Sequence, residues 1–165
     1  MKICIVSDSH DRAEPLAAAI AEAQAAGAQA VIHQVWRSHP RSAWQQHWRR
    51  SGAAPHEKTG GLFTYHGQEA VLELGGRKIF VTHMPNHGRA FACTGDYDLV
   101  CHGHSHTAHV GMQADVEGGQ CWLVNPGSVA GIDAPGVEPI PTWILGDLDR
   151  MSFEIRTLSH TLSEA

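Results

Sequence analysis

The order of predicted elements along the chain constrains its fold more than any other feature of the sequence. An apolar strand over residues 2–7 is followed by an alanine-rich helix over residues 13–26 and by a second strand over residues 30–33. Pro15 near the start of the helix and Gly27 just past its end are the expected boundary residues. Two strands joined by a helix form a βαβ unit, so we expect them to be parallel neighbours in one sheet.

From residue 62 onward the sequence pattern changes from a helix between strands to a series of hairpins. Gly75-Gly76 and Gly118-Gly119 each separate two strand-like segments, and Gly-Gly dipeptides favour the two-residue turns of hairpins. The predicted pairs are residues 70–74 with 78–82, residues 110–116 with 120–124, and residues 142–148 with 151–157. This order of elements predicts an α/β (α+β) fold with a mixed sheet.

Length, charge and cysteine content limit the number of domains and the partners. The chain has 165 residues and a net charge of −5, so we expect one domain over residues 1–165. The charge argues against nucleic acid or an anionic membrane as the main partner, because binding to phosphate backbones needs clustered Lys and Arg. No long apolar segment precedes the first polar residues, so we expect neither a signal peptide nor a membrane span. This favours a cytoplasmic protein. The four cysteines are widely spaced in mostly apolar segments, which indicates reduced core thiols.

Carboxylate and imidazole side chains recur where the predicted strands end. Asp8-Ser9-His10 follows the first strand, His83 ends the strand over residues 78–82, and Gly103-His104-Ser105-His106 follows an apolar segment. Taken singly, each motif is more typical of a capping aspartate beside a surface histidine. Three such strand ends in one short chain favour a shared site, because α/β folds gather their sites at the carboxyl ends of strands. The candidate metal ligands are Asp8, His10, His83, His104 and His106.

These motifs resemble those of the calcineurin-like metallophosphoesterases, and in particular their small bacterial phosphodiesterase branch. The matching segments are SDSH at residues 7–10, VTH at 81–83, GHSH at 103–106 and NPGS at 125–128. The resemblance covers residues 1–33 and about 59–158. It implies a layered sandwich of two mixed β-sheets flanked by helices. It also implies a hydrolase, a phosphodiesterase or phosphatase acting on small phosphate esters.

The resemblance further implies a two-metal centre. Asp8, His10 and His106 would hold one divalent ion, and His83 and His104 would hold the other. In the family, a hydroxide held between the ions attacks phosphorus in line, and both metals stabilise charge on the phosphoryl oxygens. Such mixed ligands do not select one metal; we favour manganese, with nickel, iron, cobalt, zinc and magnesium as alternatives.

Further polar residues adjoin the candidate ligands. His87 and His102 are candidates for contact with substrate, whereas we interpret His66, His109 and His160 as solvated or capping residues. Asn125 and Ser128 are expected to orient a tight turn near the site, and a purely structural turn is an equal alternative. A homo-oligomer is left open.

Residues 34 to about 58 depart from the family pattern. The segment contains three tryptophans and shows no apolar period of strand or helix. The family places two motifs here, a Gly-Asp whose carboxylate bridges the metals and a Gly-Asn whose amide oxygen binds the second metal. Neither is present, and Trp36 stands where the bridging Asp would fall. Two divalent ions ~3.5–4 Å apart repel by a raw ~17–19 kcal/mol at an effective dielectric constant of about 20, and the bridging carboxylate normally helps to offset this repulsion. Because that carboxylate is missing, we expect impaired activity.

The genetic code offers an explanation for the missing motifs. Trp is encoded only by TGG, so reading one base later gives a codon that starts with GG and encodes Gly. In that frame, residues 35–38 permit Cys-Gly-Asp-Leu and residues 43–50 permit His-Gly-Asn-Asn-Thr-Gly-Asp, which restores both motifs in order. We hypothesise that residues 34–58 are translated out of frame relative to an ancestral phosphoesterase. A divergent surface loop is the alternative.

Two functional classes therefore stay open. In the first, the protein is a phosphoesterase in which a residue such as His33, His39 or Glu57 replaces the lost ligands. In the second, it is a non-catalytic binding module or a frame-damaged pseudoenzyme, comparable with the retromer subunit that resembles this family.

Overall fold

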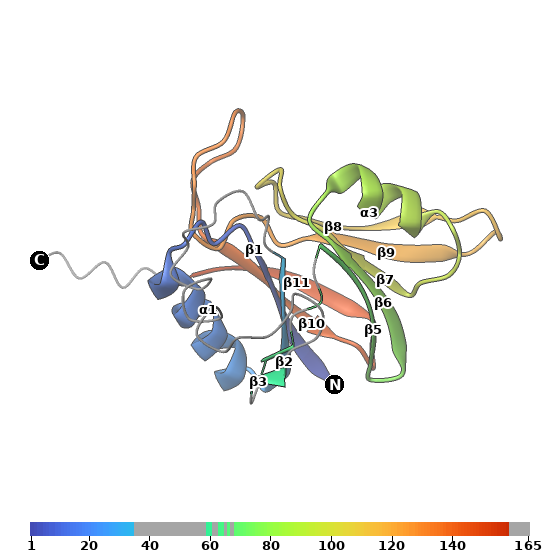
Figure 1. Ribbon diagram of the computed structural model, residues 1–165, viewed down its shortest axis with the longest axis horizontal. Coiled ribbons are helices and arrows are strands. Elements are labelled where there is room, and N and C mark those ends of the chain that lie inside the picture. Colours follow the sequence, from blue (N-terminus) through green and yellow to red (C-terminus); the bar gives the residue numbers. More distant parts are fainter. Residues whose placement is uncertain (35–58, 61–62, 65, 67, 159–165) are drawn as a thin grey trace, which may run out of the picture.

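Two β-sheets face each other across an apolar core, with a helix on the outer face of each sheet (Figure 1). The computed structural model describes residues 1–34, 59–60, 63–64, 66 and 68–158. This architecture confirms the predicted sandwich of two mixed sheets flanked by helices. Within the described residues, no helix is long and apolar enough to cross a membrane.

The first sheet has four strands in the order β11-β10-β1-β2. Its central strand β1 (Lys2–Ser7) pairs in parallel with β2 (Ala28–Gln34), and α1 (Ala13–Ala25) connects the two. This confirms the predicted βαβ unit, although β2 continues to Gln34, one residue into the anomalous segment. On its other side β1 pairs antiparallel with β10 (Thr142–Asp147), which forms the predicted hairpin with β11 (Ser152–Thr157).

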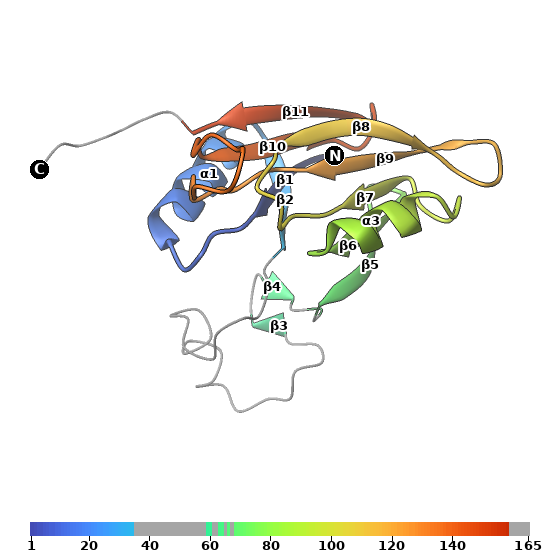
Figure 2. The same ribbon diagram turned by 90° about the horizontal axis from the view of Figure 1, so that it is seen from above.

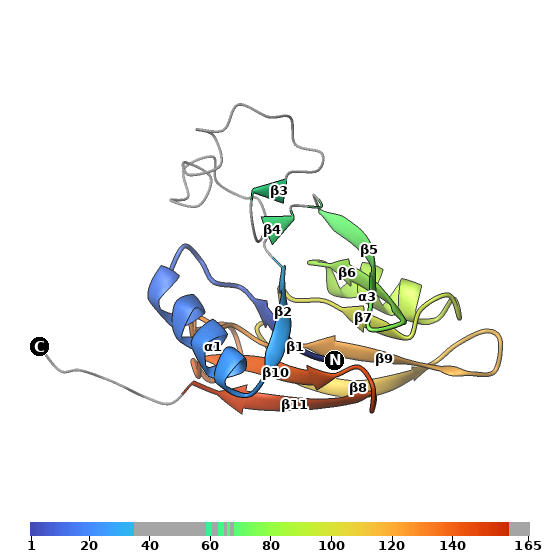
Figure 3. The same ribbon diagram turned by 90° about the horizontal axis from the view of Figure 1, so that it is seen from below.

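The second sheet has five strands in the order β5-β6-β7-β9-β8. Two of its neighbouring pairs are the predicted Gly-Gly hairpins, β5 (Glu69–Leu74) with β6 (Arg77–Thr82) and β8 (His109–Ala114) with β9 (Gln120–Asn125). The short strand β7 (Leu99–Cys101) lies between β6 and β9 and is parallel to both, which makes the sheet mixed. Two short strands, β3 (Thr59–Gly60) and β4 (Phe63–Thr64), pair with each other outside both large sheets (Figures 2 and 3).

A helix and the end of strand β8 are among the differences from the sequence prediction. The helix α3 (Pro85–Ala92) was not predicted; it covers the second sheet, with the ring of Phe91 4.1 Å from that of Phe80. Strand β8 was predicted to reach residue 116 and ends at Ala114. The Asp115 carboxylate accepts hydrogen bonds from the backbone N–H groups of two turn residues, at 2.9 and 2.8 Å, and so replaces strand pairing with a turn.

Side chains along β1 alternate in direction, so this strand contributes to the apolar clusters on both faces of its sheet. Ile3 and Ile5 point into the apolar cluster between the sheets, whereas Cys4 and Val6 point toward α1. Cys4, Cys101 and Cys121 are buried and all four cysteines are free, as expected for reduced core thiols. By the same alternation Ser7, the last residue of β1, lies on the side between the sheets. This places the loop that follows β1 at the carboxyl ends of the strands, where the candidate ligands lie.

Candidate metal centre

The candidate ligands come from three loops that leave the carboxyl ends of strands. Asp8 and His10 follow β1, His83 follows β6, and His104 and His106 follow β7. Because β1 and β2 are parallel, as are β6 and β7, the loops that follow the parallel strands of each sheet all leave it at the carboxyl ends of those strands.

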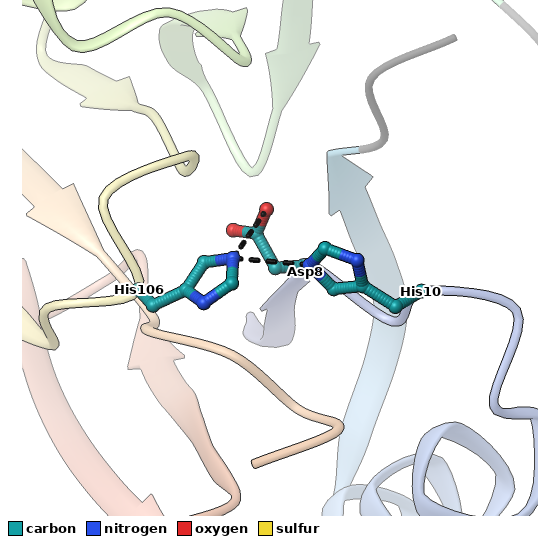
Figure 4. Close-up of side chains that lie close together, drawn as sticks. All are labelled: Asp8, His10 and His106. Carbon is teal, nitrogen blue, oxygen red and sulfur yellow. Dashed lines mark hydrogen bonds and ion pairs between the residues drawn. The ribbon is translucent and has the colours of Figure 1, made fainter. Parts of the chain in front are cut away.

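Asp8, His10 and His106 form a compact group of metal-binding side chains. Their potential ligand atoms all lie within 4.8 Å of one another. The Nε2 atoms of His10 and His106 are 3.0 Å apart, and His106 Nε2 lies 3.5 Å from Asp8 Oδ1 (Figure 4). Atoms that bind one ion at about 2.0–2.2 Å are roughly 3–3.6 Å apart at octahedral or tetrahedral angles. The group therefore fits one divalent ion.

His83 approaches the same carboxylate, and His104 lies next to His83. His83 Nε2 is 3.4 Å from Asp8 Oδ1, and the rings of His83 and His104 have centroids 5.3 Å apart. One oxygen of Asp8 thus lies at a ligand-to-ligand distance from histidines of both predicted groups. The structure brings together all five residues that the sequence predicted.

The second oxygen of Asp8 is held by the protein. Asp8 Oδ2 lies 2.7 Å from the Ser7 hydroxyl and accepts a hydrogen bond from the His104 backbone N–H at 3.0 Å. Gly103 makes this approach feasible, because a Cβ there would lie only 2.0 Å from Ser7 Oγ and 2.9 Å from Asp8 Oδ2. Asp8 Oδ1 is therefore presented in one orientation toward the histidines.

The chain also sets the tautomer of His106 and shifts the pKa of His83. His106 Nδ1 lies 3.3 Å from the backbone carbonyl of Ile132, so Nδ1 carries the proton and Nε2 keeps its lone pair toward Asp8. Burial lowers the pKa of His83; the Asp8 carboxylate opposes this effect, and His104, His10 and His106 add to it. Neutral imidazole is the form that binds a metal, and the lowered pKa of His83 favours that form.

The backbone of these loops is strained at the ligands. Asp8, His10, Asp11, His104 and His106 have φ angles of 52°, 44°, 62°, 70° and 57°. Only one other non-glycine residue in the described part of the chain, Met151, has a positive φ. Such conformations are uncommon for non-glycine residues and cluster at functional sites.

The turn at residues 125–128 ties the ligand loops together. The Asn125 side-chain amide donates to Ser105 Oγ at 2.9 Å and accepts from the Gly127 N–H at 2.9 Å. The Ser128 hydroxyl donates to the backbone carbonyl of Asp8 at 2.9 Å. The predicted orienting role of Asn125 and Ser128 thus has a structural basis, since one turn fixes the loops after both β1 and β7.

The remaining predicted residues lie around or outside this centre. His87 is exposed and lies 2.6 Å from the Glu69 carboxylate, whereas His102 is buried and its pKa is lowered, chiefly by burial. His66 and His109 are exposed, and the exposed His33 pairs with Val6. Trp36, His39, Glu57, His160 and the rest of residues 35–58 lie outside the described residues, so the hypotheses about that segment remain predictions.

Sequence reasoning missed two residues beside the centre. It did not identify Ser7 as a partner of Asp8, although Ser7 belongs to the same SDSH motif. It also did not identify Gln34, whose side chain is buried at the end of β2. No motif points to Gln34, because its environment depends on the pairing of β2 with β1.

Comparisons with known proteins agree with this fold. No curated protein sequence matches the chain at a significant level. The fold is similar to that of a novel archaeal phosphodiesterase, with a TM-score of 0.73 and 20% sequence identity. It is also similar to YfcE, a phosphoesterase from E. coli (TM-score 0.58, 16% identity), and to Vps29 from Entamoeba histolytica complexed with zinc (TM-score 0.55, 18% identity). Each alignment covers 96% of this chain and 100% of the other.

The sequence itself carries the family assignment. Residues 52–150, more than half of the chain, match the model of the calcineurin-like phosphoesterase superfamily domain. The chain therefore belongs to the calcineurin-like phosphoesterase superfamily.

Proposed function

We propose that this protein is a metal-dependent phosphoesterase, a phosphodiesterase or phosphatase, that hydrolyses small phosphate esters. The observation that carries the proposal is the convergence of His83 and His106 on one oxygen of Asp8, at 3.4 and 3.5 Å. Membership of the calcineurin-like superfamily supplies the reaction class. The mixture of carboxylate and imidazole donors supports a divalent transition metal, for which we propose manganese.

The residues of the centre have distinct roles in this proposal. Asp8, His10 and His106 hold one ion, and His83 and His104 contribute to a second position. When bound, such ions stabilise charge on the phosphoryl oxygens and lower the pKa of a water nucleophile. Ser7 and the His104 N–H fix the Asp8 carboxylate, and the carbonyl of Ile132 fixes the tautomer of His106.

We further propose that activity is impaired in this chain. The sequence contains neither the Gly-Asp nor the Gly-Asn of the family between residues 34 and 58. The second position therefore lacks two expected oxygen ligands, whereas the first keeps Asp8, His10 and His106. The expected state is one tightly held ion and slow hydrolysis.

A non-catalytic binding module is the second candidate. The missing motifs favour it, and the similar fold of Vps29 shows that the architecture is not restricted to proteins named as phosphoesterases. A direct test is Mn²⁺-dependent hydrolysis of a chromogenic aryl phosphodiester by the full chain. We expect slow turnover that His10→Ala and His106→Ala abolish and that His66→Ala, a change of an exposed histidine outside the motifs, leaves intact. Binding of Mn²⁺ without any turnover would favour the binding module.

The remaining features of the proposal concern the whole protein. We propose a single phosphoesterase domain over residues 1–165, located in the cytoplasm. Its four free cysteines, three of them buried, are consistent with a reducing compartment. The proposed partner is a small phosphate ester, with neither nucleic acid nor membrane as a main partner; self-association into a homo-oligomer is compatible with the fold.

A further inference from the structure

Gln34 carries a side-chain amide that is buried and unpaired in the described part of the chain. Its relative exposure is 3%, and in the described structure neither Oε1 nor Nε2 of its amide has a partner. Buried amides are almost always hydrogen-bonded, because leaving water without a new partner costs free energy. The buried, unpaired amide of Gln34 is therefore a candidate to bind an ion.

The position of Gln34 connects it to the centre. Gln34 is the last residue of β2 and is paired with Ser7. The Ser7 hydroxyl lies 3.2 Å from the backbone carbonyl oxygen of Gln34 and 2.7 Å from Asp8 Oδ2. Alternation along β2 puts its side chain on the same sheet face as Ile32, which packs between the sheets. From that face Ser7 approaches Gly103, the residue before His104. Gln34 thus faces the layer in which the ligand loops of the two sheets meet.

The chemistry of the amide matches what the second metal position lacks. His83 and His104 supply only nitrogen donors, and Asp8 Oδ1 is shared with the first group. Divalent ions such as Mn²⁺ accept carbonyl oxygen ligands readily. Gln34 Oε1 is a neutral oxygen donor, so it can complete the ligand set without offsetting the repulsion between two ions. An ion held in this way is bound weakly.

We propose that Gln34 Oε1 is a ligand for a second, weakly bound divalent ion beside His83 and His104. The proposal rests on the proposed function, because it assumes a first ion at Asp8, His10 and His106. It assigns Gln34 a role that compensates in part for the absent family motifs.

Titration of the metal-free, full-length protein with Mn²⁺ tests the proposal by calorimetry. We expect the wild type to bind one ion tightly and a second more weakly. Gln34→Leu should keep the tight ion and weaken the second at least tenfold, whereas Gln34→Glu should strengthen the second. Gln24→Leu, which changes an exposed glutamine of α1, is the matched control and should bind both ions as the wild type does.

Thermal melting separates a ligand role from a fault in packing. Without metal, Gln34→Leu should melt at a higher temperature than the wild type, because it removes a buried unpaired amide. Saturating Mn²⁺ should then raise the melting temperature of the wild type more than that of the variant. The inference is overturned if the wild type takes up only one ion, or if Gln34→Leu binds the second ion with unchanged affinity. Failure to bind any Mn²⁺ would instead refute the proposed function itself.

Discussion

Replacing Gly103 by Ala tests whether the close contact between the two ligand loops orders the metal centre. The new Cβ would lie 2.0 Å from Ser7 Oγ and 2.9 Å from Asp8 Oδ2, so Ser7 must move away from the Asp8 carboxylate. Overpacking a buried site costs typically about 1–3 kcal/mol, and losing a hydrogen bond to a charged group costs roughly 1.5–3 kcal/mol. We expect unfolding free energy to fall by about 3 kcal/mol and Mn²⁺ affinity to fall about 10–100-fold.

The second substitution needed is Ser7→Ala, which removes the atom closest to the added Cβ. Urea denaturation and Mn²⁺ calorimetry of Gly103→Ala, Ser7→Ala and the double variant form a double-mutant cycle. The double variant should be less destabilised than the sum of the two single changes, by about 1 kcal/mol or more, because the 2.0 Å contact with Ser7 Oγ is gone and the hydrogen bond is lost only once. The reasoning is refuted if Gly103→Ala keeps wild-type stability and metal affinity, or if the two changes are additive.

Three further outcomes are expected. After dialysis against metal-free buffer, elemental analysis should find close to one ion per chain, and two tightly held ions would contradict this. Burial raises the pKa of Cys4 and Cys121 to about 12, so the unfolded chain loses these thiol protons at lower pH than the folded chain. The free energy of unfolding should therefore be unaffected by these thiols below about pH 9 and fall by about 1 kcal/mol per thiol at pH 10, which urea denaturation at pH 7 and 10 would measure. Replacing residues 34–58 by a segment with Gly-Asp and Gly-Asn at family spacing should increase hydrolysis of an aryl phosphodiester, and His104→Ala should abolish the gain. Equal turnover before and after this repair would mean that an intact bridge already exists.

The strands were largely predictable because their signals are local. The apolar segment of β1 and the Gly-Gly turns of two hairpins depend only on neighbouring residues. The helix α3 was not predictable in the same way, since Pro85 and Gly88 in an eight-residue segment are typical of a loop. Its formation depends on packing against the second sheet, where a Cβ on Gly88 would lie 3.1 Å from His102 Cβ. That contact joins residues from different elements and leaves no local pattern.

The candidate site also contains residues that could be predicted from the sequence and contacts that could not. Asp8, His10 and His106 were predictable because a carboxylate and histidines at short spacing follow predicted strands. The groups that orient them were not, because they come from distant parts of the chain. His106 is oriented by the carbonyl of Ile132, which is 26 residues away and offers only a backbone atom. Backbone partners of this kind follow from tertiary packing and not from residue type.

The strain in the ligand loops bears on whether the centre holds an ion. Five residues at Asp8, His10, Asp11, His104 and His106 adopt positive φ, at a cost of roughly 1 kcal/mol each and on the order of 5 kcal/mol together. An ion present at a thousand times its dissociation constant stabilises the native state by about 4 kcal/mol. The two magnitudes are comparable, so one tightly bound ion can offset most of the strain. Binding of one ion can therefore maintain the geometry of Asp8, His10 and His106, even where the second metal position beside His83 and His104 lacks some of its ligands.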